Sequence, residues 1–353
     1  MKIALLSSYG IRCGLADYCT DLARAWQAQG HDIRVFSELT VDNDDPRDLP
    51  PPERHFLRTM YSAKSVAEPI LEWGPDFVSI EHEFGVWPND GEFIAALSLL
   101  QDYAETIVTL HTVPRWPFHR RFFGLLDGNV VVHHPGALVA MRAWRGFNCW
   151  PDYLPHGLSP WSPCETDREY APVPTALMPG FISASKGHFE ILSAMGHVEG
   201  WNLEIVGEAV GGDYLDLLLA RVSYLGLTDR VKIVPQFQDR QALRTRMSTA
   251  AVVLLNTVSD NFSASGQAAD AISSGAMTVS RTAPIYDALN GLGFKFGFQI
   301  GTTLPPPDEL GRAVLTAAAS LHTEEQVETM KAMCQWRSWD RMAKERLKIV
   351  GLA

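Results

Sequence analysis

Cysteine is scarce in this 353-residue sequence and follows no metal-binding pattern. The five cysteines include no C-x-x-C pair, so the spacing typical of zinc ligands is absent. An odd number of cysteines without such spacing is typical of free thiols in a reducing cytoplasm. We therefore expect neither a zinc site nor a disulfide framework.

Long apolar runs are also missing. No run approaches the roughly 20 residues that a membrane-spanning helix needs. The N-terminal segment MKIALLSSYG has one lysine and a short apolar run, but it lacks the longer apolar region and the cleavage site of a signal peptide. We interpret it as a buried first strand and expect a cytoplasmic protein.

The chain has no excess of basic residues. It contains 30 Lys and Arg against 41 Asp and Glu, for a formal net charge of -11 and a pI near 5.5. Nucleic-acid-binding proteins usually carry a basic footprint, so we expect no general nucleic-acid binding. The composition, 46% hydrophobic and 20% charged, is that of a globular protein long enough for two domains.

Short apolar runs alternate with helical patterns along most of the chain. This alternation predicts parallel strands joined by crossover helices, hence open α/β sheets. The expected strands of the first half are KIALLSS, DIRVFSE, DFVSIEHE, TIVTLHT, NVVVHH and DYLPHG. Those of the second half are TALMPGF, WNLEIVGE, RVKIVPQF, AAVVLLN and AMTVS, and the tail from Pro307 is expected to be helical.

The alternation breaks once, at a segment rich in Pro and Ser, Leu158–Pro174, which we interpret as an interdomain linker. We therefore predict an α/β protein with two facing Rossmann-like domains, residues 1–160 and 161–335. Residues 336–353 are expected to form a helix that crosses back to the first domain.

In such sheets, ligands bind beyond the carboxyl ends of the strands. One expected strand ends in Glu81-His82-Glu83, within VSIEHEFGVWPNDG. Two carboxylates around an imidazole suggest a metal site, an acid/base pair or a sugar-binding edge. The order E-H-E is not HExxH, and His111 and His156 follow other strands, so we expect no metal site.

Three further segments have the character of anion-binding loops. Gly14 lies in a glycine-containing turn that opens the first helix, although the turn is not GxGxxG. Gly180 and Lys186 follow the first strand of the second half, and a lysine there suits a phosphate group. Ser265 and Gly266 start a helix, and Asp270, one turn further in, could reach a ribose hydroxyl pair.

The ordered series of motifs resembles the GT-B glycosyltransferases of the retaining glycosyltransferase family 4 type. The series is the glycine loop, EHEFG, TLHT, PHG, GF…KG, the S-x-S-G helix with its acidic residue, and the final RSWDRMAKERL helix. It covers nearly the whole chain. The resemblance implies a hexosyltransferase that moves mannose or glucose from a nucleoside diphosphate sugar to a hydroxyl of a glycan or glycolipid precursor.

The resemblance also implies roles for individual residues. The catalytic residues would be His111, beside the transferred sugar, and Lys186, on the donor pyrophosphate. Glu81, His82, Glu83 and His156 would hydrogen-bond the acceptor. The donor site would comprise Gly14, Gly180, Lys186, Ser265, Gly266 and Asp270. The co-substrate is a nucleotide sugar, and no cofactor or essential metal is expected.

The sequence departs from the family pattern around the donor motif. Phe181 stands where the family often has Arg, and Phe262 where it has the first acidic residue; Asp260 is the acidic residue nearest to that position. Asp270 replaces the usual Glu. These changes leave open a catalytically silent nucleotide-sugar-binding scaffold, and the fold also leaves open a sugar-nucleotide epimerase.

Arg115–Leu126 mixes three arginines with aromatic residues. Such a segment is either an ordinary helix or a weak contact with an anionic membrane surface.

Overall fold

The computed structural model describes residues 1–39, 53–56, 60–87, 90–113, 129–142, 151–163, 173–258, 263–296, 307–318, 320 and 322–352. The segment 115–126 and Asp260, on which two of the sequence hypotheses depend, lie outside these residues. The chain divides into two compact units. The first comprises Met1–Gly157, Asn261–Ala264 and Arg337–Ala353, and the second comprises Leu158–Asp260 and Ser265–Trp336.

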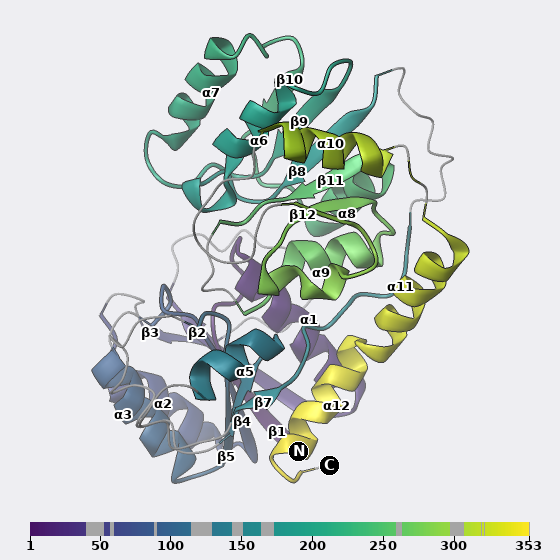
Figure 1. Cartoon of the computed structure of the whole chain (residues 1–353). Helices are drawn as coiled ribbons and strands as arrows, with labels where there is room; N and C mark the ends of the chain where they lie inside the picture. Colours follow the sequence, from purple (N-terminus) through teal and green to yellow (C-terminus); the bar gives the residue numbers. More distant parts are fainter. Residues whose placement is uncertain are drawn as a thin grey trace. The chain divides into compact units, whose positions relative to one another are not determined.

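In the described part of the first unit, seven parallel strands form one sheet in the order β3-β2-β1-β4-β5-β6-β7 (Figure 1). The strands are β1 (Lys2–Leu6), β2 (Asp32–Glu38), β3 (Glu53–Phe56), β4 (Phe77–His82), β5 (Glu105–Leu110), β6 (Asn129–Val132) and β7 (Asp152–Tyr153). Its helices are α1 (Gly14–Ala28), α2 (Ala63–Trp73), α3 (Asp90–Gln101), α5 (Pro135–Arg142) and α12 (Trp339–Ile349).

Alternation of side chains along the strands builds two apolar layers in this unit. Ile3 and Leu5 of β1 point to the side covered by α1 and α12, whereas Ala4 and Leu6 point to the side covered by α2 and α3. All four are at most 1% exposed. Helix α12, from the C-terminus, is therefore part of the core of the N-terminal unit.

The second unit repeats this architecture with six parallel strands, within the residues described, in the order β10-β9-β8-β11-β12-β13. The strands are β8 (Thr175–Pro179), β9 (Asn202–Val206), β10 (Val231–Val234), β11 (Val252–Leu255), β12 (Thr278–Arg281) and β13 (Phe294–Phe296). The helices are α6 (His188–Met195), α7 (Tyr214–Tyr224), α8 (Arg240–Thr249), α9 (Gly266–Ser273), α10 (Pro307–Ala318) and α11 (Glu324–Trp336).

Each sheet reverses its strand order at its centre. The reversal lies between β1 and β4 in the first unit and between β8 and β11 in the second. At such a switch point the neighbouring crossovers go to opposite faces and leave the carboxyl ends of the two strands uncovered. The loops that begin at Ser7 and Glu83 lie there in the first unit, and those that begin at Gly180 and Asn256 lie there in the second.

The predicted α/β class with two Rossmann-like parallel sheets is confirmed. The sequence analysis did not predict β3, α8 and β13, which are short or largely polar, or α2, which contains Pro69 within the helix. Cys13, Cys19 and Cys334 are free thiols. No helix among the described residues combines the length and the apolar character needed to cross a membrane.

Gly157 tests how tightly α12 is packed in the first unit. A Cβ at this position would lie 2.5 Å from Cδ2 of the Trp339 indole, a rigid ring at the start of α12. We expect Gly157→Ala to lower the free energy of unfolding by about 1–3 kcal/mol, the usual cost of overpacking. Gly14→Ala is the control, because no atom lies within 4 Å of the new Cβ. Urea unfolding measures both, and equal effects would contradict the expectation.

Candidate functional site

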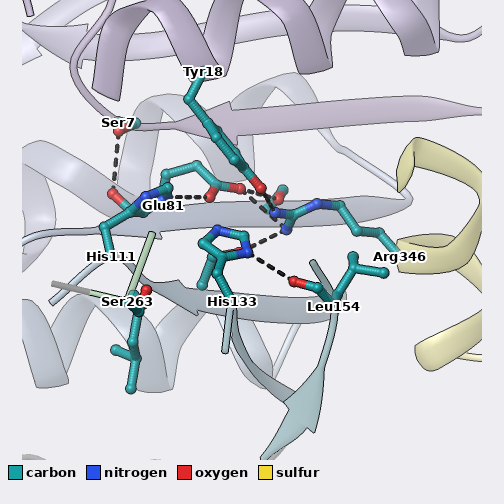
Figure 2. Close-up of polar contacts among 11 residues, drawn as sticks. Ser7, Tyr18, Glu81, His111, His133, Leu154, Ser263 and Arg346 are labelled. Atoms are coloured by element: carbon teal, nitrogen blue, oxygen red, sulfur yellow. Dashed lines mark hydrogen bonds and ion pairs between the residues drawn. The ribbon is translucent and has the colours of Figure 1, made fainter. Parts of the chain in front are cut away.

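A buried ion pair lies at the switch point of the first unit. Glu81, near the end of β4, places Oε1 3.2 Å from Nη1 of Arg346 on α12, and both side chains are 0% exposed (Figure 2). The strand and the helix come from opposite ends of the chain. A buried charge pair of this kind is tolerated only where further hydrogen bonds satisfy both groups.

Most of those hydrogen bonds are present, and Nε of Arg346 is the one buried polar atom of the two side chains that has no partner among the described residues. Arg346 Nη1 donates to Oγ1 of Thr109 at 2.6 Å, and Nη2 donates to the hydroxyl of Tyr18. Ser79 donates its hydroxyl to Glu81 Oε1 at 3.0 Å. Burial by itself would raise the pKa of Glu81, but Arg346 and the hydrogen bond from His111 outweigh it and lower the pKa below its ordinary value. Glu81 is therefore an ionised carboxylate inside the protein.

His111 is the next group along this network. It follows β5, and its Nε2 lies 2.9 Å from Glu81 Oε2. Because an ionised carboxylate only accepts, Nε2 must carry a proton, and in the neutral ring Nδ1 then has the lone pair. The side chain is 13% exposed, and the backbone N–H of Ser263 donates to His111 O at 2.8 Å. The pair fixes both the tautomer and the orientation of the ring.

Three imidazole rings, including that of His111, and one indole ring lie around Tyr18. Ring centroids lie 4.6 Å from Tyr18 for His111, 5.3 Å for His133, 5.1 Å for His156 and 4.8 Å for Trp339. His133 Nδ1 donates to Leu154 O at 2.8 Å, and burial lowers the pKa of His133 well below its ordinary value. His133 is thus a neutral ring.

His133 was missed by the sequence analysis, although its strand NVVVHH was predicted. A histidine directly after a buried strand was the available signal, as it was for His111. His156, which was predicted, donates Nδ1–H to Gly157 O at 2.6 Å. Among the residues that the structure describes, no group of three or more His, Cys, Asp or Glu side chains could hold a metal ion.

The structure changes the interpretation of the other EHEFG residues. Glu81 and His82 were expected to offer polar atoms to sugar hydroxyls, but both are 0% exposed. His82 packs against the rings of Phe84 and Phe93, at centroid distances of 4.7 and 4.8 Å. Glu83 is half-buried and accepts hydrogen bonds from Gly85 N at 2.5 Å and from Thr112 Oγ1 at 3.1 Å, so it shapes the loop.

Gly14 starts α1 at the neighbouring strand end. Cys13 caps the helix, with Sγ accepting from Ala16 N at 3.3 Å. Gly10 has a φ of 63°, so the tight turn that the sequence predicted requires a glycine at this position. Ser7 donates its hydroxyl to Glu81 O at 3.1 Å and ties this turn to β4.

A second polar cluster occupies the switch point of the second unit. Lys186 ends a short 3-10 turn after β8, and its Nζ lies 3.2 Å from Gln267 Oε1 and 3.4 Å from Thr257 Oγ1. No carboxylate of the described residues pairs with it. Burial lowers the pKa of Lys186 to about 8. Near neutral pH the ammonium is a cation that has no counterion among the residues that the structure describes.

Helix α9 begins beside this cation. Ser265 caps the helix by accepting from Ala268 N at 3.2 Å, and Gly266 and Gln267 are the first two helical residues. The N–H groups of a first turn have no partner within the helix, and they lie at the positive end of its dipole. Gly180, with a φ of 105°, passes directly beneath Gln267. The structure thus brings Gly180, Lys186, Ser265 and Gly266 to one strand edge.

Asp270 lies one turn further along α9 and is 8% exposed. Its Oδ1 accepts from Nε and Nη2 of Arg240, both at 2.9 Å, so the carboxylate is already part of an ion pair. Arg240 is the first residue of α8, a helix that the sequence analysis did not predict. No sequence signal connected the two residues.

By sequence, the chain matches no protein-family model and no curated protein. By structure it resembles sucrose-phosphate synthase from Thermosynechococcus elongatus, with a TM-score of 0.76 at 16% identity over 99% of this chain and 98% of that one. A glycosyltransferase from Rickettsia africae gives 0.74 at 15% identity over 99% and 97%. Anabaena HepE, solved in complex with UDP, gives 0.76 at 14% identity over 100% of both chains. The chain therefore has the GT-B fold.

Removing one member of the buried ion pair tests the network. Arg346→Met leaves the Glu81 carboxylate buried without a counterion, and we expect the free energy of unfolding at pH 7 to fall by about 3–5 kcal/mol. In the variant the unpaired carboxylate has a raised pKa, so the loss should be smaller at pH 5, where the group takes up a proton. Urea unfolding at the two pH values measures this.

Two further variants control that experiment. Lys348→Met removes a 55% exposed charge from the same helix and should change stability by at most about 1 kcal/mol. Glu81→Gln combined with Arg346→Met should recover part of the loss, because no charge stays buried. A double variant as unstable as the sum of the two single variants would contradict the interpretation.

Proposed function

We propose that this chain is a retaining glycosyltransferase that moves a hexose, mannose or glucose, from a nucleoside diphosphate sugar to an acceptor hydroxyl. The observation that carries the proposal is the cation of Lys186, which has no counterion in the described part of the chain and lies beside the first turn of α9 at a switch point. A group with a negative charge is what such a site lacks. The fold supports the same conclusion, because HepE, which shares it, was also solved with UDP-glucose.

The donor site follows from the chemistry of the second unit. Lys186 makes a charge-assisted hydrogen bond to the diphosphate, and the N–H groups of Gly266 and Gln267 bind its other oxygens. Gly180 has no side chain and thereby leaves the space that the Gln267 amide occupies beside the cation. Asp270 accepts a ribose hydroxyl with a carboxylate that Arg240 holds in place. No cofactor or metal is part of this proposal.

The reaction needs little covalent participation by the protein. The bond between the anomeric carbon and the diphosphate oxygen breaks, the acceptor oxygen forms a bond on the same face, and the diphosphate takes up the acceptor proton. Lys186 and the α9 dipole stabilise the negative charge that develops on the departing diphosphate. Donor and acceptor react because they are held in position.

The first unit contributes His111. Its Nδ1 has a lone pair that accepts a hydrogen bond from a hydroxyl of the transferred sugar, while Glu81 holds Nε2. Glu83 and His156 bind the acceptor, a glycan or glycolipid precursor. Glu81 and His82 are fully buried, so in this proposal they do not contact the acceptor.

The direct test is turnover. The purified chain is incubated with UDP-glucose and with GDP-mannose, alone and with a panel of glycan and glycolipid acceptors. We expect release of UDP or GDP to depend on an acceptor, and proton NMR to find the anomeric configuration of the donor retained in the product. If the chain binds the nucleotide sugars but neither releases UDP or GDP nor transfers the sugar, the proposed enzymatic activity is wrong and the chain is a nucleotide-sugar-binding scaffold.

Lys186→Ala tests the donor site. Loss of a charge-assisted hydrogen bond of roughly 1.5–3 kcal/mol should raise the Kd for the nucleoside diphosphate about 10- to 100-fold. Lys232→Ala, which removes a 73% exposed lysine, is the control and should leave the Kd unchanged. Calorimetry measures both, and an unchanged Kd in Lys186→Ala would contradict the assignment.

The affinity should also depend on pH through the same lysine. Because its pKa in the free protein is about 8, the ammonium loses its proton as the pH rises from 7 to 9, and the wild-type affinity should fall over that interval. The Lys186→Ala protein should lack this dependence. Asp270→Asn should weaken binding less than Lys186→Ala, since the amide keeps one acceptor.

His111→Ala tests the chemistry of the first unit. We expect kcat to fall by roughly 10- to 100-fold, as for other lost contacts to a reacting group, while the Kd for the donor changes much less. His197→Ala, at an exposed position on the second unit, is the control. A kcat within about threefold of wild type would make His111 a structural residue at the end of β5.

A further inference from the structure

Gln267 connects three parts of the second unit through one side chain. Its Nε2 donates to Pro179 O at the end of β8 at 2.8 Å, and its Oε1 accepts from Lys186 Nζ at 3.2 Å. Gln267 is itself the second residue of α9. The side chain therefore links the end of the central strand, the first turn of the helix and the cation.

Chemistry determines which way the amide faces. The carbonyl of Pro179 has no proton to donate, so only the NH₂ end of Gln267 can face it. The oxygen end must then face Lys186, which as an ammonium can only donate. The two contacts thus require the same rotamer and reinforce each other.

The Gln267 side chain lies where a side chain of residue 180 would otherwise be, and it fits there because residue 180 is a glycine. A Cβ at Gly180 would lie 1.5 Å from Gln267 Nε2, closer than any non-bonded contact allows. With its φ of 105°, Gly180 provides both the backbone conformation and the space. Gln267 is therefore seated in a fixed position and does not lie loosely over the site.

The partners of Lys186 leave its charge intact. Gln267 Oε1 and Thr257 Oγ1 are neutral acceptors, and Thr257 is held in turn by the hydroxyl of Tyr286, which donates to Oγ1 at 2.8 Å. An ammonium has three N–H donors, so two neutral contacts orient it while the third donor and the full charge remain for a ligand. A carboxylate in place of the amide would neutralise it.

We propose that Gln267 is a positioning residue that aims the Lys186 ammonium at the diphosphate of the donor. The inference rests on the proposed function, and it adds a residue that the sequence analysis did not single out. Gln267 does this with a neutral amide oxygen, so it leaves the charge of the ammonium available for a ligand. Affinity for the phosphate groups, and not for the nucleoside, should depend on it.

The test is a double-mutant cycle with Gln267→Met and Lys186→Met, because methionine keeps the length of each side chain and removes its polar atoms. Calorimetry at pH 7 gives the Kd of each protein for UDP and GDP, and for uridine and guanosine. We expect Gln267→Met to raise the diphosphate Kd about 5- to 10-fold and to leave the nucleoside Kd within twofold. In the Lys186→Met background the same change should have no effect.

Two other variants complete the design. Gln241→Met, at an exposed glutamine of α8, is the control and should change no Kd. Gln267→Glu brings a negative charge to the ammonium, and we expect it to weaken diphosphate binding more than Gln267→Met. This variant also keeps the proposal testable if Gln267→Met fails to fold.

The outcomes separate the two proposals. A large effect of Lys186→Met together with an unchanged Kd in Gln267→Met overturns the role of Gln267 and leaves the donor site standing. Equal weakening of nucleoside and diphosphate binding in Gln267→Met also overturns it, because a merely structural residue would act that way. If the wild-type chain binds neither UDP nor GDP, the proposed function fails and the role of Gln267 fails with it.

Discussion

The ion pair between Glu81 and Arg346 is the constraint on which the first unit depends. Burying two full charges costs several kcal/mol per ion, so the pair depends on the hydrogen bonds that surround it. Those bonds come from β4, β5, α1 and α12. The C-terminal helix is consequently part of the same cluster that holds the His111 ring, and its position and the ring orientation are set together.

The switch points of the two units differ in whether their buried charge is neutralised by another residue. In the first, an arginine neutralises a buried carboxylate, and that carboxylate serves to orient an imidazole. In the second, Lys186 has only neutral oxygen partners and keeps its charge. A neutralised pair supports structure, whereas a partly buried cation without a counterion favours a ligand that supplies the missing charge. This difference is the basis on which we propose a donor site in the second unit.

Position 181 is a phenylalanine where the family pattern often has an arginine, and other residues of the second unit bear on this loss of a cation. With one cation fewer than the family pattern, the proposed affinity for a diphosphate would rest more heavily on the geometry of Lys186. Gln267, which holds that lysine through a neutral amide, and Gly180, which makes room for the amide, fit this need. The departures from the family pattern are thus compatible with a working donor site.

The sequence by itself determined the fold class and the strand ends where the polar residues lie. Apolar runs of strand length between helical patterns are local signals, and they predicted both parallel sheets and the placement of His111, Lys186 and Ser265 at strand ends or a helix start. Only the tertiary structure decided the partners of those residues. Glu81 with Arg346, Asp270 with Arg240, and Lys186 with Gln267 are pairs of residues far apart in the chain, on different elements. No local pattern encodes such a pairing, because it follows from which crossover packs on which face of the sheet. The burial of Glu81 and His82, which the sequence analysis expected to reach the acceptor, also follows from the packing of the elements around the sheet.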